Sequence, residues 1–269
     1  MLSRVAVGIV YCIIIIVIVT IFFVYQDFKC NWENKNEGEI SNIENIQFRT
    51  GDLLFYRSQC GIANRKFDKF AKSDREFSRK FHKTKLKTKF TLNNLKESVK
   101  NGFFEWYSGT NYTHVGLVVV IKGTPYLYEI TEIGERLKPY IRFSWFDFRN
   151  QDKSPPIVID VNYLKKYQGN IHLYKYIGDD ISEKKILNLF ESNQNLIYNF
   201  SSFFKYTILG IKPTNEIVCC NFLSNNMNKI GIYGFKNVYA IHHGILLNLI
   251  VQEKIPYDKK YVTIKNVYT

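Results

Sequence analysis

The sequence predicts an α+β domain, with an antiparallel sheet packed on a helix, behind one membrane-spanning helix. Three observations lead to this prediction. An apolar run without charges occupies residues 5–25. Two apolar runs, 114–121, which is rich in β-branched residues, and 126–130, flank a turn containing Gly and Pro, which is the pattern of a hairpin. After Ser182 the apolar residues recur at helical spacing, and strands grouped apart from helices are typical of the α+β class.

The N-terminal apolar run is long enough to cross a membrane. At a rise of about 1.5 Å per residue, residues 5–25 span about 30 Å, the thickness of a bilayer's hydrocarbon core. A cleaved signal peptide is the alternative, but its apolar region is usually about 7–15 residues long and ends in small residues. This run ends in large residues, Phe22-Phe23-Val24-Tyr25. We therefore expect a single-pass anchor over residues 1–25.

The rest of the chain is expected to form one domain. Residues 26–46 are polar and predict a linker, so the domain is expected over 47–269, with an insertion at about 58–108. Helices are expected after Ser182, from about Cys219 to a stop at Gly231, and over about 240–252. The expected strands are 53–56, 114–121, 126–130, 157–161, 171–176 and 261–264.

The cysteines do not form the pattern of a disulfide framework. They are Cys12, Cys30, Cys60, Cys219 and Cys220, an odd and sparse set. In an extracellular domain the plausible bridge would join Cys30 to Cys60, and in the cytosol every thiol would be free.

Cys219 is the candidate nucleophile. It follows an extended stretch, residues 215–218, and begins a helical pattern. Free backbone N–H groups and the positive end of the helix dipole stabilise a thiolate at that position. The alternative is an inert buried thiol, because free cysteines are among the residue types most often buried.

His114 and Glu129 are the candidate base and orienting group. His114 opens an apolar strand, and Glu129 is a carboxylate within the apolar run of the paired strand. In a simple hairpin Glu129 lies far enough along the second strand to approach His114. A carboxylate there would fix the tautomer and orientation of the imidazole, which is the third role in a nucleophile–base–orienter set.

Five segments carry a family resemblance, in an order in which the histidine precedes the cysteine. They are Gly51-Asp52-Leu53-Leu54-Phe55, Thr113-His114-Val115-Gly116-Leu117-Val118, Tyr128-Glu129, Tyr198-Asn199 and Cys219-Cys220-Asn221-Phe222-Leu223. Over about residues 47–269, less the insertion, the chain resembles the circularly permuted branch of the NlpC-like papain-fold cysteine hydrolases. That branch includes the relatives of lecithin:retinol acyltransferase.

The resemblance implies a permuted papain-like fold and a role for each matching residue. Cys219 matches the nucleophile, His114 the base, Glu129 the polar third member, and Tyr198 a tyrosine that lines the site and assists the oxyanion. The family usually has Ser-Glu after its cysteine, where this chain has Cys220 and Asn221, and Asp where it has Asn199. No cofactor and no metal are implied. His242 and His243 are expected to be structural, because adjacent residues point apart on a helix and no ligands are spaced around them.

The insertion is the most basic part of the chain, which has a formal net charge of +13. An amphipathic helix is expected within it, either packed on the domain with its basic face in solvent or lying on an anionic membrane. Electrostatic nucleic-acid binding is a weaker alternative, since no recognised module accompanies the lysines. The apolar face would consist of Phe67, Phe70, Ala71, Phe77 and Phe81.

These features predict a membrane-anchored thiol hydrolase or acyltransferase that cleaves an amide, ester or thioester through an acyl-cysteine. Membrane lipids and an acyl, lipid or peptide substrate are the expected partners. The alternative is a catalytically inactive papain-like protein of a membrane or virion. The charges around the anchor are too few to set its orientation. Glycans at the sequons of Asn111 and Asn199 would obstruct the site, so we favour a cytosolic or virion-interior domain.

Overall fold

A computed structural model of the chain describes residues 4–32, 39–58, 112–130, 156–166, 169–199 and 214–265, with short pieces between 95 and 110 and between 202 and 212. The chain divides into two units. One contains Met1–Lys35 and Ser58–Thr113, and the other contains Asn36–Arg57 and His114–Thr269. The amphipathic helix expected around Phe67–Phe81 lies outside the described residues, as do Cys60 and the side chain of Cys30.

The first unit contains the long helix α1 (Arg4–Trp32). Its segment Gly8–Gln26 has a mean hydropathy of 2.9 and is apolar and long enough to span a membrane, although a signal sequence meets the same criteria. The helix extends beyond Tyr25, where the sequence predicted the end of the anchor. Within this unit, Phe23 makes an edge-to-face contact with Phe103 at 5.4 Å between ring centroids.

The second unit is built on a curled mixed sheet that contains seven strands among the described residues, in the order β1-β9-β6-β2-β3-β4-β5. The strands β2 to β5 form consecutive antiparallel pairs, β6 pairs with β9 antiparallel, and β1 pairs with β9 parallel. Their bounds are β1 (Glu39–Asn42), β2 (Leu53–Ser58), β3 (His114–Ile121), β4 (Thr124–Glu129), β5 (Ile157–Asp160), β6 (Gly169–Tyr176) and β9 (Tyr257–Lys265).

Strand β1 corrects the expected domain boundary. Residues 26–46 were expected to be a polar linker, but Glu39–Asn42 pairs in register with Val262 to Lys265 of β9. The short 3₁₀ helix η1 (Ile43–Asn45) follows and buries Ile43 in the core. The reason is that an edge strand uses its backbone to join the sheet, so its side chains can stay polar. The sheet domain therefore starts at residue 39 rather than at 47.

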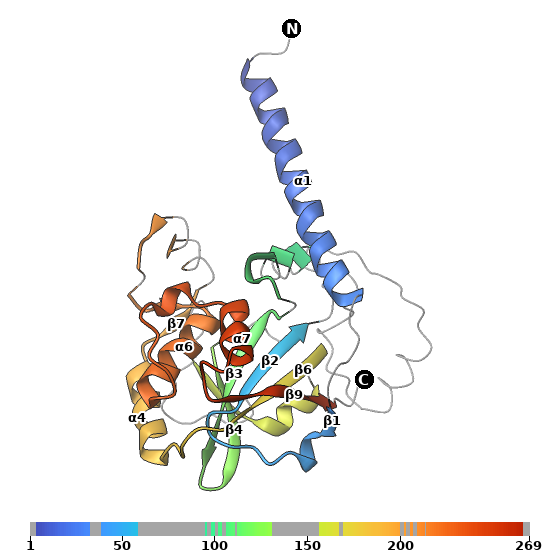
Figure 1. Ribbon diagram of the computed structural model, residues 1–269. Helices are drawn as coiled ribbons and strands as arrows, with labels where there is room; N and C mark the ends of the chain where they lie inside the picture. The colour runs from blue at the N-terminus through green and yellow to red at the C-terminus, as the bar shows by residue number, and fades with distance from the viewer. Residues whose placement is uncertain are drawn as a thin grey trace. The chain divides into compact units, whose positions relative to one another are not determined.

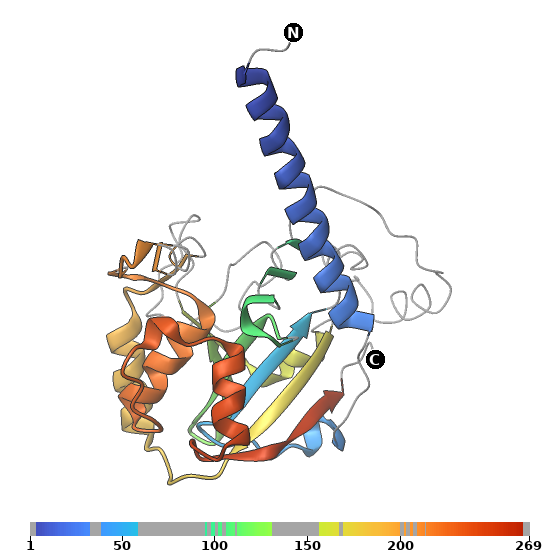
Figure 2. The same ribbon diagram turned by 45° about the horizontal axis from the view of Figure 1, so that its top comes forward.

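Both faces of the sheet are covered. One face carries Val118, Leu127 and Ile159, which pack with η1 and with the 3₁₀ helix η2 (Val161–Lys166). The other is covered by helices, and Figures 1 and 2 show them together at one side of the sheet. Tyr128 of β4 makes ring contacts there with Phe190 at 4.7 Å and Phe222 at 5.0 Å. The helices are α4 (Glu183–Asn193), α6 (Cys219–Ile230) and α7 (His243–Val251), with the 3₁₀ helix η3 (Val238–Ala240) between the last two.

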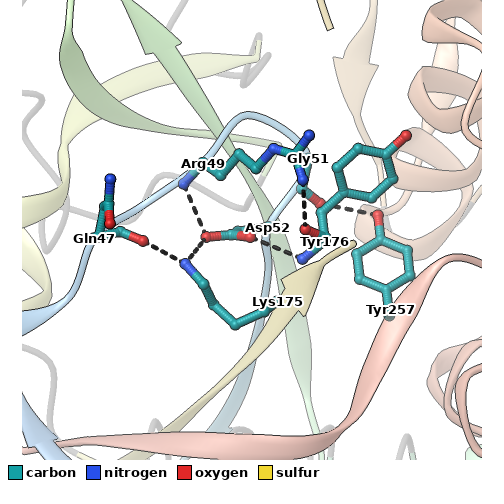
Figure 3. A network of polar contacts seen from close by, with 7 residues as sticks. All are labelled: Gln47, Arg49, Gly51, Asp52, Lys175, Tyr176 and Tyr257. Carbon is teal, nitrogen blue, oxygen red and sulfur yellow. Dashed lines mark hydrogen bonds and ion pairs between the residues drawn. The ribbon is translucent and has the colours of Figure 1, made fainter. Parts of the chain in front are cut away.

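The turn Gly51-Asp52 before β2 links β2 to β6 through hydrogen bonds. Asp52 is fully buried and accepts hydrogen bonds from Lys175 Nζ at 2.6 Å and from the Tyr176 amide at 2.9 Å, as Figure 3 shows. It also accepts one from the Arg49 amide at 2.9 Å. Gly51 has a φ of +103°, and a Cβ there would lie 2.8 Å from the Tyr176 ring. The motif thus holds two neighbouring strands together, at the opposite end of β2 from the residue paired with His114.

Candidate active site

The start of α6 presents Cys219. Val218 is extended, with φ −107° and ψ 166°, and its carbonyl accepts the first helical hydrogen bond, from Phe222. Cys219 is therefore the first residue of the helix, next to N–H groups that have no partner within the helix. The helix ends at Gly231, whose φ of +84° is the left-handed conformation that glycine adopts readily. Start and stop both confirm the pattern expected from the sequence.

The β3–β4 hairpin brings His114 and Glu129 together. His114 Nε2 lies 2.8 Å from Glu129 Oε2, and the Glu129 carboxylate is buried. The register that pairs Leu117 with Tyr128 sets Glu129 opposite Gly116, two residues from His114 on the same face. A Cβ on Gly116 would lie 3.2 Å from Glu129 Oε2. The missing side chain at Gly116 therefore leaves room for the carboxylate to reach the imidazole.

The other side of His114 is bounded by Tyr56. The two residues are paired across β2 and β3, and their ring centroids lie 5.1 Å apart at 45°. The His114 side chain is 19% exposed. Tyr56 and Glu129 together restrict the rotation of the imidazole, so its orientation is set by the sheet.

His114 and Cys219 lie close enough for each to shift the pKa of the other. Since His114 Nε2 faces Glu129, the ring's other nitrogen, Nδ1, is the one available to the thiol. Burial opposes a charge on the imidazole, but the Glu129 carboxylate and the hydrogen bonds to Cys219 and Glu129 outweigh it and raise the pKa of His114 to about 10.

The pKa of the Cys219 thiol is lowered, in the direction opposite to that of His114. A hydrogen bond from Cys220 does most to lower the pKa of Cys219 well below its usual value; burial opposes the shift, and hydrogen bonds from His114 and His243 add to it. For Cys220, burial and the neighbouring Cys219 raise the pKa. The lowered pKa of Cys219 and the raised pKa of His114 favour a thiolate beside an imidazolium, and the raised pKa of Cys220 favours its neutral thiol. This favours Cys219 over Cys220 as the reactive thiol.

His243 is the site residue that the sequence did not indicate. It is the first residue of α7, is buried, and places Nε2 3.9 Å from Cys219 Sγ. The sequence showed no ligands spaced around His242 and His243, but the tertiary structure supplies two. The thiols of Cys219 and Cys220 and a ring nitrogen of His243 all lie within 4.8 Å of one another. A separation of 24 residues across a loop leaves no periodic signal for this contact.

Asn221 has a structural role next to the two cysteines. Its Nδ2 donates to the carbonyls of Val238 at 2.8 Å and Ile241 at 3.0 Å, which ties the η3 segment ahead of α7 to α6.

Tyr198 lies in the short strand β7 (Ile197–Tyr198), which pairs in parallel with β8 (Glu216–Ile217), two residues before Cys219. The backbone of Tyr198 is therefore near the start of α6, and the role of its ring stays a prediction.

This arrangement has the parts of a thiol-based acyl-transfer site. It combines a lowered thiol pKa, an oriented imidazole and the N-terminus of a helix, where backbone N–H groups can receive a developing negative charge. A scan with models of known protein families and a search of curated proteins found no match to the chain.

Proposed function

We propose that this chain is a membrane-tethered cysteine hydrolase or acyltransferase that forms an acyl-cysteine at Cys219. The observation that carries the proposal is the position of His114. Its imidazole contacts the Glu129 carboxylate at 2.8 Å, and both Glu129 and the Cys219 thiol raise its pKa. Nucleophile, base and orienter are then linked in series, which is the arrangement that activates a weak nucleophile.

The chemistry follows from the charges of the resting pair. The Cys219 thiolate attacks the acyl carbonyl carbon, a C–S bond forms, and the carbonyl oxygen becomes an oxyanion facing the backbone N–H of Cys219. The oxyanion collapses, the bond to the leaving group breaks, and the His114 imidazolium gives it a proton. Water or an acceptor alcohol or amine then loses a proton to His114 as it attacks the thioester, which releases the acyl group and restores the pair.

We also propose that the fold is a permuted papain-like one. The order along the chain, with the histidine strand, the carboxylate strand and then the cysteine helix, supports it. So does the packing of α6 on β3 and β4. Within this proposal α1 is a retained single-pass anchor, and the domain acts in the cytosol or inside a virion on an acyl, lipid or peptide substrate. The apolar segment Gly8–Gln26 supports the anchor.

The test uses the full-length protein in lipid vesicles and an alkyl β-lactone, an acylating electrophile. We expect an acyl adduct on Cys219, found by peptide mass spectrometry, and none on that peptide in Cys219→Ala. His114→Ala should slow acylation by about 10²–10⁴-fold, the usual contribution of a general base. Cys12→Ser removes a thiol in α1 and serves as the matched control with an unchanged rate. Equal acylation of Cys219→Ala, or an adduct only on Cys220, refutes the proposal.

A non-catalytic binding scaffold is the second candidate function, and one observation favours it. The Cys219 residue is only 4% exposed, so a substrate reaches the sulfur only if neighbouring groups move. A scaffold predicts that native Cys219 reacts no faster with the β-lactone than a thiol in the unfolded chain. The enzyme predicts a faster reaction in the folded protein, so one comparison of rates before and after denaturation separates the two functions.

A further inference from the structure

Two groups beside the proposed nucleophile form or break no bond in the proposed acyl transfer. Cys220 and His243 are both buried, at 4% and 1% exposed. They come from different elements, the start of α6 and the start of α7, and both contact Cys219. Two thiols and an imidazole gathered in one buried place require an explanation of their own, since neutral packing would be served by apolar side chains.

We propose that Cys219, Cys220 and His243 form a binding site for a soft divalent cation of the Zn²⁺ type, and that the bound ion blocks the thiol. The three ligand atoms, both Sγ and a ring nitrogen of His243, lie within 4.8 Å of one another, and Cys219 Sγ is 3.9 Å from His243 Nε2. Zinc bonds of about 2.0–2.3 Å separate tetrahedral ligand atoms by roughly 3.5–3.8 Å. Closing this cluster onto an ion therefore takes side-chain shifts of about 1 Å or less.

The ligand types select the cation. Thiolate and imidazole are preferred by Zn²⁺ and related soft or borderline ions, whereas Mg²⁺ and Ca²⁺ prefer carboxylate and carbonyl oxygens. Three protein ligands leave one position for water or another donor. Both sulfurs bind the metal as thiolates, so any proton that they carry leaves for solvent.

The surrounding hydrogen bonds hold the ligands in place before an ion arrives. Asn221 fixes the carbonyls of Val238 and Ile241, which precede His243 in the loop to α7. Ser224 Oγ donates to the same Val238 carbonyl at 3.3 Å. Both donors come from α6, the helix that bears the two cysteines. The two halves of the site are therefore fixed to each other by contacts that do not involve the ligand atoms.

The blocking effect rests on the proposed function, whereas the metal site does not. A thiolate whose lone pair is shared with Zn²⁺ is a weaker nucleophile, and the ion also occupies the space between Cys219 and His243. Chelation restores the free thiol. Acyl transfer by this protein is therefore expected to be inhibited by Zn²⁺ and relieved by removing it.

The experiment titrates the full-length protein in vesicles with ZnCl₂ against a chelating indicator, and with CoCl₂ followed by absorbance. We expect one ion per chain and a thiolate-to-cobalt charge-transfer band. Cys220→Ser and His243→Ala should each weaken binding by at least about 10–100-fold, with folding checked by circular dichroism. Cys12→Ser should bind as the native chain does. Alkylation of Cys219 by iodoacetamide should stop in Zn²⁺ and resume in EDTA.

The outcomes separate the two proposals. Affinity unchanged in both Cys220→Ser and His243→Ala, or a cobalt spectrum without a thiolate band, overturns the metal site while β-lactone acylation of Cys219 is left standing. A site that binds one ion through all three ligands in a chain that the β-lactone never acylates supports the metal site and refutes the acyltransferase. If either variant fails to fold, the cobalt spectrum of the native chain decides alone.

Discussion

The Nε2 atom of His114 lies 2.8 Å from Oε2 of Glu129, diagonally across two paired strands, over a position occupied by glycine. The carboxylate is only 4% exposed, so its charge acts on the imidazole through little solvent. This contact keeps the imidazole charged and fixes which ring nitrogen faces the thiol. Several measurable properties of the site depend on it.

Replacing Glu129 with Gln should lower the pKa of His114 from about 10, because the carboxylate is the largest favourable contribution to it. NMR titration of ¹³C-labelled histidine, with His114→Ala to assign the signal, measures the shift. The raised pKa stabilises the folded state fully below the ordinary value of about 6.5 and loses that effect as pH rises through about 10. The unfolding free energy of Glu129→Gln should therefore fall less over that range. A His114 signal that titrates identically in both proteins contradicts the contact.

Cys220 should control the reactivity of Cys219 because its S–H group lowers the pKa of the Cys219 thiol. A hydrogen bond from Cys220 is the largest cause that lowers the pKa of Cys219, and a serine hydroxyl can still donate where alanine cannot. Alkylation by iodoacetamide in EDTA, followed against pH, should therefore show its acidic limb at higher pH in Cys220→Ala than in Cys220→Ser. Coinciding limbs in these two variants would remove Cys220 from the account.

Gly116→Ala should separate Glu129 from His114. The new Cβ would lie 2.6 Å from Leu127 Cδ1 and 3.2 Å from Glu129 Oε2, so both side chains must shift. Overpacking of this kind costs about 1–3 kcal/mol of unfolding free energy, measured by urea denaturation. Gly234→Ala is the matched control, because its Cβ would meet nothing within 4 Å. Equal stability of the two variants would mean that the hairpin has more room than the distances indicate.

Asn221→Asp should loosen the loop that carries His243. The Asn221 amide donates to two carbonyl oxygens, and a carboxylate has no proton to offer them and repels both. The expected cost is about 1–3 kcal/mol of unfolding free energy, together with weaker Zn²⁺ binding. Asn248→Asp is the control, because it makes the same chemical change at an exposed position of α7, away from those two carbonyls. A loss confined to Asn248→Asp would contradict the assignment.

Asp52→Asn should destabilise the fold without touching the site. Both carboxylate oxygens accept hydrogen bonds, Oδ1 from the Tyr176 amide and Oδ2 from Arg49 N and Lys175 Nζ. Whichever way the new amide turns, its NH₂ faces a donor. We expect a loss of roughly 2–4 kcal/mol of unfolding free energy with unchanged acylation of Cys219 in the folded fraction. Asp180→Asn, whose side chain is 94% exposed, should leave the urea midpoint unchanged.

Local pattern was sufficient to predict much of the sheet and the helices. The strand that begins at His114, the turn after it and the helix from Cys219 to Gly231 were predicted with their bounds nearly as observed, because alternation and helical spacing are properties of neighbouring residues. Strand β1 was not predicted, because a four-residue polar edge strand has no apolar alternation. Its pairing with β9 depends on backbone hydrogen bonds, which the side-chain pattern of these residues does not reveal.

The site divides in the same way. The sequence by itself determined the contact of His114 with Glu129, since a hairpin joined by a tight turn fixes which residues lie opposite each other. The pairing of Cys219 with His114 was expected only from the family resemblance, and only the tertiary structure decided that Cys220 and His243 lie beside Cys219. Those residues come together because α6 and α7 bury their apolar faces against the sheet. The hydrophobic effect is non-directional, so it creates no residue spacing in the sequence from which the cluster could be predicted.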